Sequence, residues 1–488
     1  MKRVGIIGTG FSSLTAAIEL SKMGFEVDVF EKNSSPGGRA RHFKVDGFTF
    51  DMGPSWYWMP DVFEDFFNKH NKKISDYYDL VKLDPGFSIY YEDQNRLDIP
   101  ESFEELTKVF ESIEKGSSER LEKFIKRAEK KYDIGVRNLV YKPSESILEF
   151  LNIKVIKGAF HLDIFTVFSK YVRRYFKHPK LVKLMEFPIL FLGALPSNTP
   201  AMYSLMNYSA LKQGTYYPIG GFFKIIDSLV KIAEESGVKF HYDSEITKIN
   251  VSKKIVENFE INNKKIPVDI VVAGADYHHV ETNLLQKKYR NYDDKYWDSR
   301  KLAPSSLLFY LGVNKKLSNV NHHTLFFDQD FAIHAAEIYE TPKWPSSPLF
   351  YMSCPSVSDE TIAPKGMENL MLLIPLAPGL EDTQEMREKY FNIMIERIQK
   401  LTANDFKENI VYKKSYCVKD FEKDYHAYKG NAYGLANTLN QTAILKPSLR
   451  NKQIKNLFYT GQLTVPGPGV PPSIISGQVV ASEINKHF

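Results

Sequence analysis

The sequence predicts an α/β fold in which one nucleotide-binding domain is assembled from three separated stretches of the chain. The first stretch contains a strand, a glycine-rich turn, a helix and a second strand within about 30 residues. The second, residues 216–249, has a Gly-Gly turn, a helix, a glycine cap and a strand. The third, residues 456–488, has a strand, a glycine-proline loop and a helix. We therefore expect a discontinuous domain.

Composition favours a globular protein with more than one domain. At 488 residues the chain is too long for one compact core. The net charge of +5 is small for this length, so a nucleic-acid partner is not expected. Cys354 and Cys417 have no metal-binding or C-x-x-C spacing, which excludes a disulfide framework and points to a reducing compartment.

No apolar run has the length of a membrane-spanning helix, which needs about 18 residues. The longest run, residues 187–195, is about half that length and holds a proline. The N-terminal run RVGIIG is too short for a signal sequence. We expect a cytoplasmic protein that does not cross a membrane but is able to lie on one.

The first stretch justifies the nucleotide-binding prediction. Gly8 and Gly10 suit the tight turn and the close approach of backbone to a pyrophosphate, while Ser13 stands at the third glycine position, which needs only a small side chain. The helix that begins near Phe11 would point its N-terminus at the pyrophosphate. Glu31 ends the second strand about 20 residues later, where an acid binds ribose hydroxyls and disfavours NADP.

Between these stretches the expected structure is mixed. Residues 33–60 are rich in loop-forming residues, and residues 60–131 show the charge pattern of solvated amphipathic helices. Residues 147–213 are expected to be helical and more apolar. Residues 280–450 are mixed, with strand candidates such as SSLLFYLGV, LFYMSCP and NLMLLIPLA.

Two further loops favour FAD over NAD. The turn Gly37-Gly38-Arg39 would bring backbone amides and a guanidinium against a diphosphate, which a simple NAD domain does not need. The run from Gly467 to Gly469 leads into a C-terminal helix whose N-terminus would stabilise negative charge on the N1–C2 edge of a reduced flavin. The alternatives are a hairpin with a surface arginine and a rigid connecting loop.

Taken in order, these motifs resemble the bacterial phytoene-desaturase type of carotenoid desaturase. The resemblance rests on GxGxxS…E…PGGRA…GFTFDMGPS, YYPIGGF, VVAGADYHHVETNLL and NLFYTGQLTVPGPGVPPSIISG, and it covers nearly the whole chain. It implies a glutathione-reductase-like FAD-binding Rossmann domain, formed by residues 1–75, 215–280 and 450–488. An α+β substrate domain that faces the membrane, residues 76–214 and 281–449, would be inserted in pieces.

The resemblance also implies which residues hold the cofactor, and two positions depart from the family pattern. Ser13 replaces a glycine, and Gly274 stands where the family usually has asparagine. Neither cysteine lies near Gly461, so the FAD is expected to be non-covalent. The residues that would contact or position it are Gly8, Gly10, Ser12, Ser13, Glu31, Lys32, Gly38, Arg39, Gly53, Pro54, Ile246, Gly461, Gly469, Val470 and Pro471.

By this resemblance the reaction would transfer a hydride from an allylic C–H bond of a long carotenoid to flavin N5, with loss of a proton from the neighbouring carbon. Since the polyene stabilises positive charge, little acid–base help is expected, and the sequence has no clear triad or metal cluster. Glu149 and Asp163 are the candidate proton acceptors, although solvated helix positions are the more ordinary interpretation of both. His278-His279 and His322-His323 are interpreted as ordinary core or surface residues.

The substrate and the partners stay open at this point. Phytoene, or a later monocyclic or hydroxylated carotene desaturated at its 3,4 bond, would fit. A flavin amine oxidase, a redox-neutral carotenoid isomerase and a non-catalytic carotenoid-binding protein are the alternatives. Oxygen or a quinone would accept the electrons. Residues 150–211 would form a monotopic surface on the cytoplasmic membrane, with Arg173 and Lys177 near the head groups, or else a buried helical subdomain.

Overall fold

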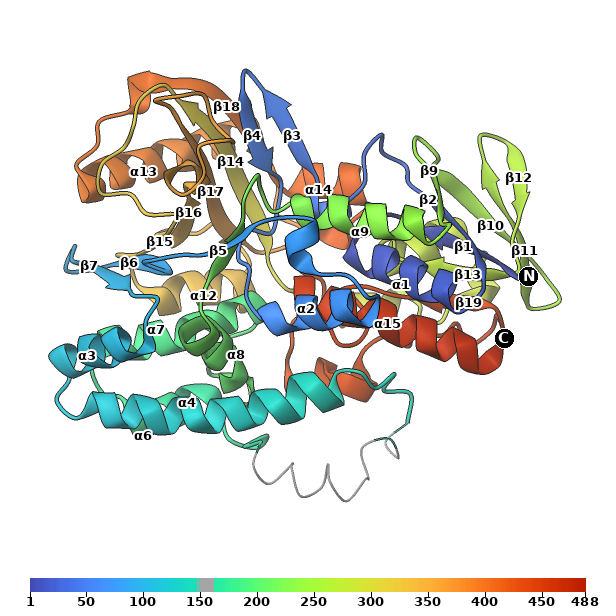
Figure 1. Ribbon diagram of the computed structural model, residues 1–488, viewed down its shortest axis with the longest axis horizontal. Coiled ribbons are helices and arrows are strands. Elements are labelled where there is room, and N and C mark those ends of the chain that lie inside the picture. Colours follow the sequence, from blue (N-terminus) through green and yellow to red (C-terminus); the bar gives the residue numbers. More distant parts are fainter. Residues whose placement is uncertain (147–148, 150–161) are drawn as a thin grey trace.

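A computed structural model of the chain describes residues 1–146, 149 and 162–488 (Figure 1). Its nucleotide-binding-like part is a five-stranded sheet in the order β19-β13-β1-β2-β9, in which every neighbouring pair is parallel. The strands come from the start, the middle and the end of the chain, so the predicted α/β fold is confirmed. They are β1 (Arg3–Ile7), β2 (Glu26–Phe30), β9 (Lys239–His241), β13 (Ile270–Ala273) and β19 (Leu457–Tyr459).

The sheet is buried on both faces, which explains why β1 is a continuous apolar run. Val4 and Ile6 belong to the core beneath the helices, whereas Ile7 packs with Phe259 on the opposite face. The helices that contribute to this core are α1 (Phe11–Lys22), α9 (Lys224–Glu235) and α15 (Val470–His487). The opposite face is covered by an antiparallel meander of β10 (Ile246–Ser252), β11 (Ile255–Ile261) and β12 (Lys264–Pro267).

A second, seven-stranded sheet has the order β18-β14-β17-β16-β15-β6-β7, and only the pair β15 and β6 is parallel. The three strand candidates in residues 280–450 are confirmed as β14, β16 and β17. The strands are β6 (Phe87–Tyr91), β7 (Arg96–Ile99), β14 (Ser305–Val313), β15 (His323–Phe327), β16 (Phe350–Ser353), β17 (Glu368–Leu376) and β18 (Ile410–Tyr416). One face of this sheet forms a core with helix α13 (Gln384–Thr402).

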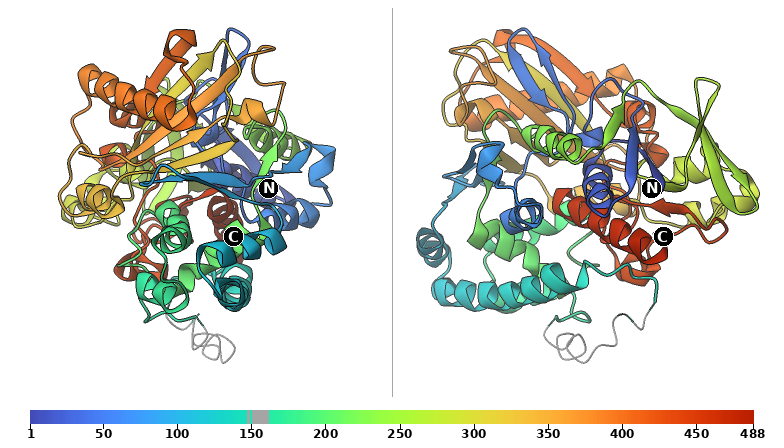
Figure 2. Two further views of the ribbon diagram at one scale, coloured as in Figure 1. Left: turned by 90° about the vertical axis from the view of Figure 1, so that its left-hand side faces the viewer. Right: turned by 45° about the vertical axis from the view of Figure 1, so that its right-hand side comes forward.

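A group of helices lies at one side of the molecule, away from the meander, as both views agree (Figures 1 and 2). It consists of α3 (Phe103–Ile113), α4 (Ser117–Ile134), α6 (Phe168–Tyr175), α7 (Pro179–Glu186) and α8 (Leu205–Tyr208). The other α-helices of the described residues are α2 (Pro60–Lys69), α10 (Tyr277–His279), α11 (Asp294–Asp298), α12 (Phe331–Tyr339) and α14 (Val418–Tyr425). Within the described residues, no helix combines the length and the apolarity needed to cross a bilayer.

One prediction about local structure is wrong, and another is incomplete. The span 60–131 is not helical throughout, because β5 (Leu80–Lys82), which pairs with β8 (Tyr216–Pro218), precedes β6 and β7. β6 is buried at every position, so it shows no alternation that would reveal a strand beside the charged helices. The span 33–60, expected to be rich in loops, also holds the short hairpin of β3 (His42–Val45) and β4 (Phe48–Asp51).

Candidate functional site

One cavity of about 450 Å³ extends from the turn after β1 to the seven-stranded sheet. All the predicted cofactor-contacting residues except Ser13 and Pro471 line it. The structure thus brings together positions from both ends and the middle of the chain. The lining residues among them are Gly8, Gly10, Ser12, Glu31, Lys32, Gly38, Arg39, Gly53, Pro54, Ile246, Gly461, Gly469 and Val470.

The N-terminus of α1 fits a diphosphate. Gly10 is the N-cap residue, and no side chain caps the helix. The first helical bond runs from the Leu14 amide to the Gly10 carbonyl at 3.0 Å, so the three preceding amides are available to an anion. A Cβ atom at Gly10 would meet nothing within 4 Å, which means that the backbone is open to the cavity at this point.

The second glycine loop packs directly on the first. Gly38 has a φ of +54°, and a Cβ atom there would lie 3.3 Å from the Cα of Gly10. Beside it the Arg39 guanidinium lines the cavity, and its Nε has no hydrogen-bond partner, while Nη2 donates to the Asn431 carbonyl at 3.4 Å. Burial lowers the pKa of Arg39, opposed by the charge of Asp276. A guanidinium with an unsatisfied, buried Nε beside a helix N-terminus fits a bound diphosphate.

The Glu31 carboxylate is held firmly at the end of β2. The amide and hydroxyl of Thr9 donate to its Oε2 at 3.0 and 2.6 Å. The amide and side chain of Asn33 donate to Oε1 at 2.9 and 2.7 Å. Each carboxylate oxygen accepts two of these bonds, so the four donors fix the orientation of the carboxylate, and a ribose hydroxyl would have to share an oxygen with one of them. The sequence pattern did not reveal Thr9 or Asn33 as its partners.

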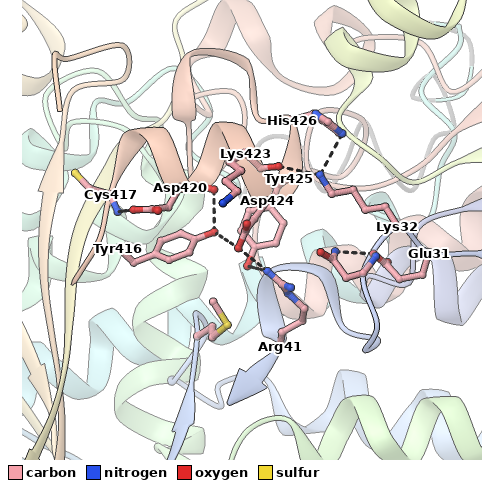
Figure 3. Close-up of polar contacts among 12 residues, drawn as sticks. Glu31, Lys32, Arg41, Tyr416, Cys417, Asp420, Lys423, Asp424, Tyr425 and His426 are labelled. Atoms are coloured by element: carbon pink, nitrogen blue, oxygen red, sulfur yellow. Dashed lines mark hydrogen bonds and ion pairs between the residues drawn. The ribbon is translucent and has the colours of Figure 1, made fainter. Parts of the chain in front are cut away.

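Helix α14 lines the cavity near Glu31, which the sequence did not predict, and Figure 3 shows its polar contacts with Lys32 and Arg41. Lys32 Nζ donates to the Lys423 carbonyl at 2.8 Å and lies 3.2 Å from His426 Nε2. Arg41 forms an ion pair with Asp424 at 2.7 Å. Phe421, Asp424, Tyr425 and His426 line the cavity. Because α14 is nearly 400 residues away in sequence and carries no motif, only the tertiary structure places it here.

The N-terminus of α15 forms another part of the cavity wall. Gly469 is its N-cap residue with a φ of 112°, and no side chain caps it. Pro471 and Pro472 have no amide hydrogen, so Val470 supplies the first-turn amide ahead of Ser473, which already bonds to the Gly469 carbonyl. Gly469 and Val470 line the cavity and Pro471 does not. One free amide and the helix dipole therefore point to this part of the cavity.

The two candidate proton acceptors lie elsewhere. Asp163 forms ion pairs with Arg127 and Lys131 at 3.0 and 2.9 Å. Glu149 accepts bonds from the amides of residues 144–146. Neither residue lines the cavity, so the structure does not bring them to the site.

The wall formed by residues 304–375 is apolar. Among the residues of this wall that line the cavity, none is acidic and one, His334, is a histidine. The Nδ1 of His334 accepts from the Leu349 amide and its Nε2 donates to the Pro375 carbonyl, both at 2.9 Å. Burial lowers the pKa of His334 to about 4, so the ring is neutral. The apolar members of this wall include Leu308, Leu325, Phe327, Leu349, Phe350 and Leu373.

The described chain holds no cluster of three or more histidine, cysteine, aspartate or glutamate residues suited to a metal ion. Cys354 and Cys417 are free and buried, and neither lines the cavity. Of the histidine pairs, His322 and His323 are buried, whereas His279 lines the cavity and stacks on His426 with ring centres 3.9 Å apart.

The chain is similar in sequence to known proteins along its whole length. Residues 11–485 match the model of the flavin containing amine oxidoreductase family. A carotenoid 3,4-desaturase from Haloarcula japonica is 39% identical, with 99% of this chain and 97% of the relative covered. A zeta-carotene-forming phytoene desaturase from Myxococcus xanthus is 28% identical, with 99% and 94% covered.

Solved structures show the same fold at low sequence identity. An oxidoreductase from Methanosarcina mazei superimposes with a TM-score of 0.65 at 14% identity, covering 98% of this chain and all of the other. Wild-type putrescine oxidase bound to putrescine gives a TM-score of 0.60 at 12% identity, with 99% and 98% covered.

Proposed function

Because this chain belongs to the flavin-containing amine oxidoreductase family, it is an oxidoreductase with a flavin cofactor, and we propose that it is an FAD-dependent carotenoid desaturase. The full-length similarity to carotenoid desaturases supports the substrate class. The observation that carries the proposal is the apolar wall between residues 304 and 375, which faces the nucleotide loops across one cavity. Such a wall suits a long hydrocarbon and offers no carboxylate to a substrate ammonium group.

The bound FAD would supply a hydride acceptor. In this proposal the α1 amides and Arg39 hold its diphosphate, and Glu31 holds the adenosine ribose. Ile246 lies beside the adenine, and the Val470 amide lies at the N1–C2 edge of the flavin. Gly53 and Pro54, which line the same cavity, come next to the flavin ring.

We infer that the FAD is bound without a covalent link, since neither cysteine lines the cavity. Denaturing the purified protein and passing it over a desalting column should then release all the yellow colour. Colour that stays with the unfolded chain would contradict this inference.

The domain division is also a proposal. Residues 1–75, 215–280 and 450–488 contribute every strand of the parallel sheet, which supports assigning them to FAD binding. Residues 76–214 and 281–449 contribute every strand of the seven-stranded sheet, which supports assigning them to the substrate.

A membrane surface and an oxygen or quinone acceptor complete the proposal. Phe165, shortly before α6, is 98% exposed and would be the apolar side chain that reaches the lipid. Arg173 is paired with Glu186 within the chain, and the part of the proposed surface from 150 to 161 lies outside the described residues. Because the substrate dissolves in the bilayer, the enzyme would have to lie on the cytoplasmic membrane to receive it.

The decisive experiment is expression in a host that accumulates successive carotenoid precursors, including phytoene and monocyclic or hydroxylated carotenes. A desaturase lengthens the conjugated system and shifts the absorption of one precursor to longer wavelength. In anaerobic mixing of purified protein, that precursor should bleach the flavin and putrescine should not. Isomerisation without bleaching would favour a redox-neutral isomerase, and bleaching by amines alone would favour an amine oxidase.

A further inference from the structure

A second, much smaller cavity of about 20 Å³ lies next to the main one. The two cavities share Ser55, which directly follows the Gly53-Pro54 turn. The polar residues that line the smaller cavity include Asp51, Ser55, Tyr217, His322 and Asn369. Ser55 therefore connects the apolar cavity with a polar one.

The small cavity is suited to one water molecule. Its volume exceeds the minimum of about 15 Å³ that a water needs. Asn369 is 2% exposed, and its Oδ1 has no hydrogen-bond partner although its Nδ2 donates to the Thr49 carbonyl at 2.7 Å. A water bonded to Asn369, Ser55 and Asp51 would satisfy this buried oxygen, which is the usual role of ordered internal water.

Asp51 is a suitable proton acceptor at the far side of this cavity. Its two oxygens accept from the amides of Phe222 and Phe223 at 2.6 and 2.9 Å, which fixes the carboxyl group. Burial raises the pKa of Asp51 to about 7, with Asp227 and Asp359 adding to the shift. The other ionisable groups around it include Tyr217, Tyr310 and His322, and His42 lies opposite it in the register of β3 and β4.

The Ser55 hydroxyl is held in place from the opposite direction. Its Oγ lies 3.0 Å from the Tyr351 hydroxyl, which lies 2.6 Å from the Nδ1 of His323. The His323 ring is stacked on Trp56 with centres 4.2 Å apart and planes 12° from parallel. This buried chain keeps the hydroxyl at the boundary between the two cavities.

We propose that Ser55 passes the proton released by the substrate, through one water molecule in the small cavity, to the carboxylate of Asp51. This inference rests on the proposed desaturation. Forming one C=C bond removes a hydride from one carbon and a proton from the adjacent carbon. The bound flavin would accept the hydride. That proton bonds to Ser55 Oγ while the serine's own proton moves to the water and a water proton moves to Asp51. The serine and the water end neutral, and the carboxylate becomes a carboxylic acid.

The first test needs no substrate. Infrared titration of the flavin-loaded protein should show the carboxylic-acid band of Asp51, which disappears as the pH rises, with a midpoint near pH 7. This band should be missing in Asp51→Asn. Ser55→Ala should shift this band, because the bridging water loses a partner, and Ser55→Thr should restore it. Tyr78→Phe, which breaks a buried 3.0 Å hydroxyl pair with Tyr57 outside both cavities, is the matched control and should leave the band in place.

The second test uses the carotenoid that bleaches the wild-type flavin. Ser55→Ala should slow the bleaching about 100-fold, the usual contribution of a positioned proton acceptor. Deuterium at the substrate carbon that loses the proton should then slow the bleaching more in Ser55→Ala than in the wild type. An unshifted band in Ser55→Ala, or bleaching as fast as in the wild type, overturns the relay. Failure of every carotenoid to bleach the wild-type flavin overturns the proposed function instead, and the infrared result still decides whether the two cavities are connected.

Discussion

A Cβ atom built at Gly274 would lie 1.9 Å from the Oγ of Ser13, so the serine side chain fills the space that any larger residue at 274 would need. Ser13 and Gly274 are the two departures from the family pattern noted in the sequence. They are in contact, since the turn after β13 packs on the first turn of α1. A serine fits at the third glycine position because the residue packed against it, Gly274, has no side chain.

This contact predicts a double-mutant cycle. Gly274→Ala alone should lower the free energy of unfolding by about 1–3 kcal/mol, because the new methyl group meets Ser13 and a backbone oxygen. Ser13→Gly alone should cost about 1 kcal/mol or less, as for a glycine in a helix. In the Ser13→Gly background the cost of Gly274→Ala should shrink by more than 0.5 kcal/mol. Urea unfolding measures all four proteins, and strictly additive costs would refute the coupling.

Glu31→Ala should weaken FAD retention. The change removes the ribose acceptor and leaves the Thr9 and Asn33 donors unpaired, each charged bond being worth about 1.5–3 kcal/mol. The measurement is the dissociation constant of FAD from fluorescence titration of apoprotein. Glu26→Ala, at the exposed start of the same strand and paired with Lys239 at 3.0 Å, is the control that should bind FAD normally. Equal binding by both variants would place the ribose elsewhere.

Arg39→Met should raise the FAD dissociation constant roughly 10- to 150-fold, because the FAD diphosphate would lose the guanidinium whose buried Nε is unsatisfied in the protein. Arg41→Met provides the comparison, since Arg41 pairs with Asp424 and does not line the cavity. Arg41→Met should lower the melting temperature of the apoprotein, and it should change the FAD dissociation constant much less than Arg39→Met does. If Arg39→Met instead lowers the melting temperature of the apoprotein and leaves the FAD dissociation constant unchanged, Arg39 is a structural residue only.

His334 should make the protein sensitive to acid. Burial lowers its folded-state pKa from 6.5 to about 4, so between these pH values the unfolded chain binds a proton that the folded chain does not. Its stabilising contribution is complete above pH 6.5 and is lost as the pH falls through this window, by up to about 3 kcal/mol. His334→Gln preserves a donor and an acceptor, and should flatten the fall in unfolding free energy between pH 7 and pH 4. An equal slope in both proteins would contradict the assignment.

Local sequence was informative wherever one residue type has one physical use. Gly8, Gly10 and Glu31 were predicted to share a site because a turn, a close backbone approach and a ribose acid impose strict demands at a known spacing, and all three line the main cavity. β6 was missed because a strand buried on both faces has no alternation, and the helical pattern of its charged neighbours dominated. The contact of α14 with Lys32 and Arg41 had no local signal at all.

The sequence by itself determined the α/β class, the discontinuous parallel sheet and most of the loop residues with which that sheet lines the cavity, since these follow from short-range periodicity and from backbone geometry that few residues permit. Only the tertiary structure decided that Ser13 packs on Gly274 rather than lining the cavity, that Glu149 and Asp163 lie outside it, and that Ser55 joins it to Asp51. These relationships depend on which side chains meet across elements far apart in the chain, and residue identity and spacing carry no record of those distances.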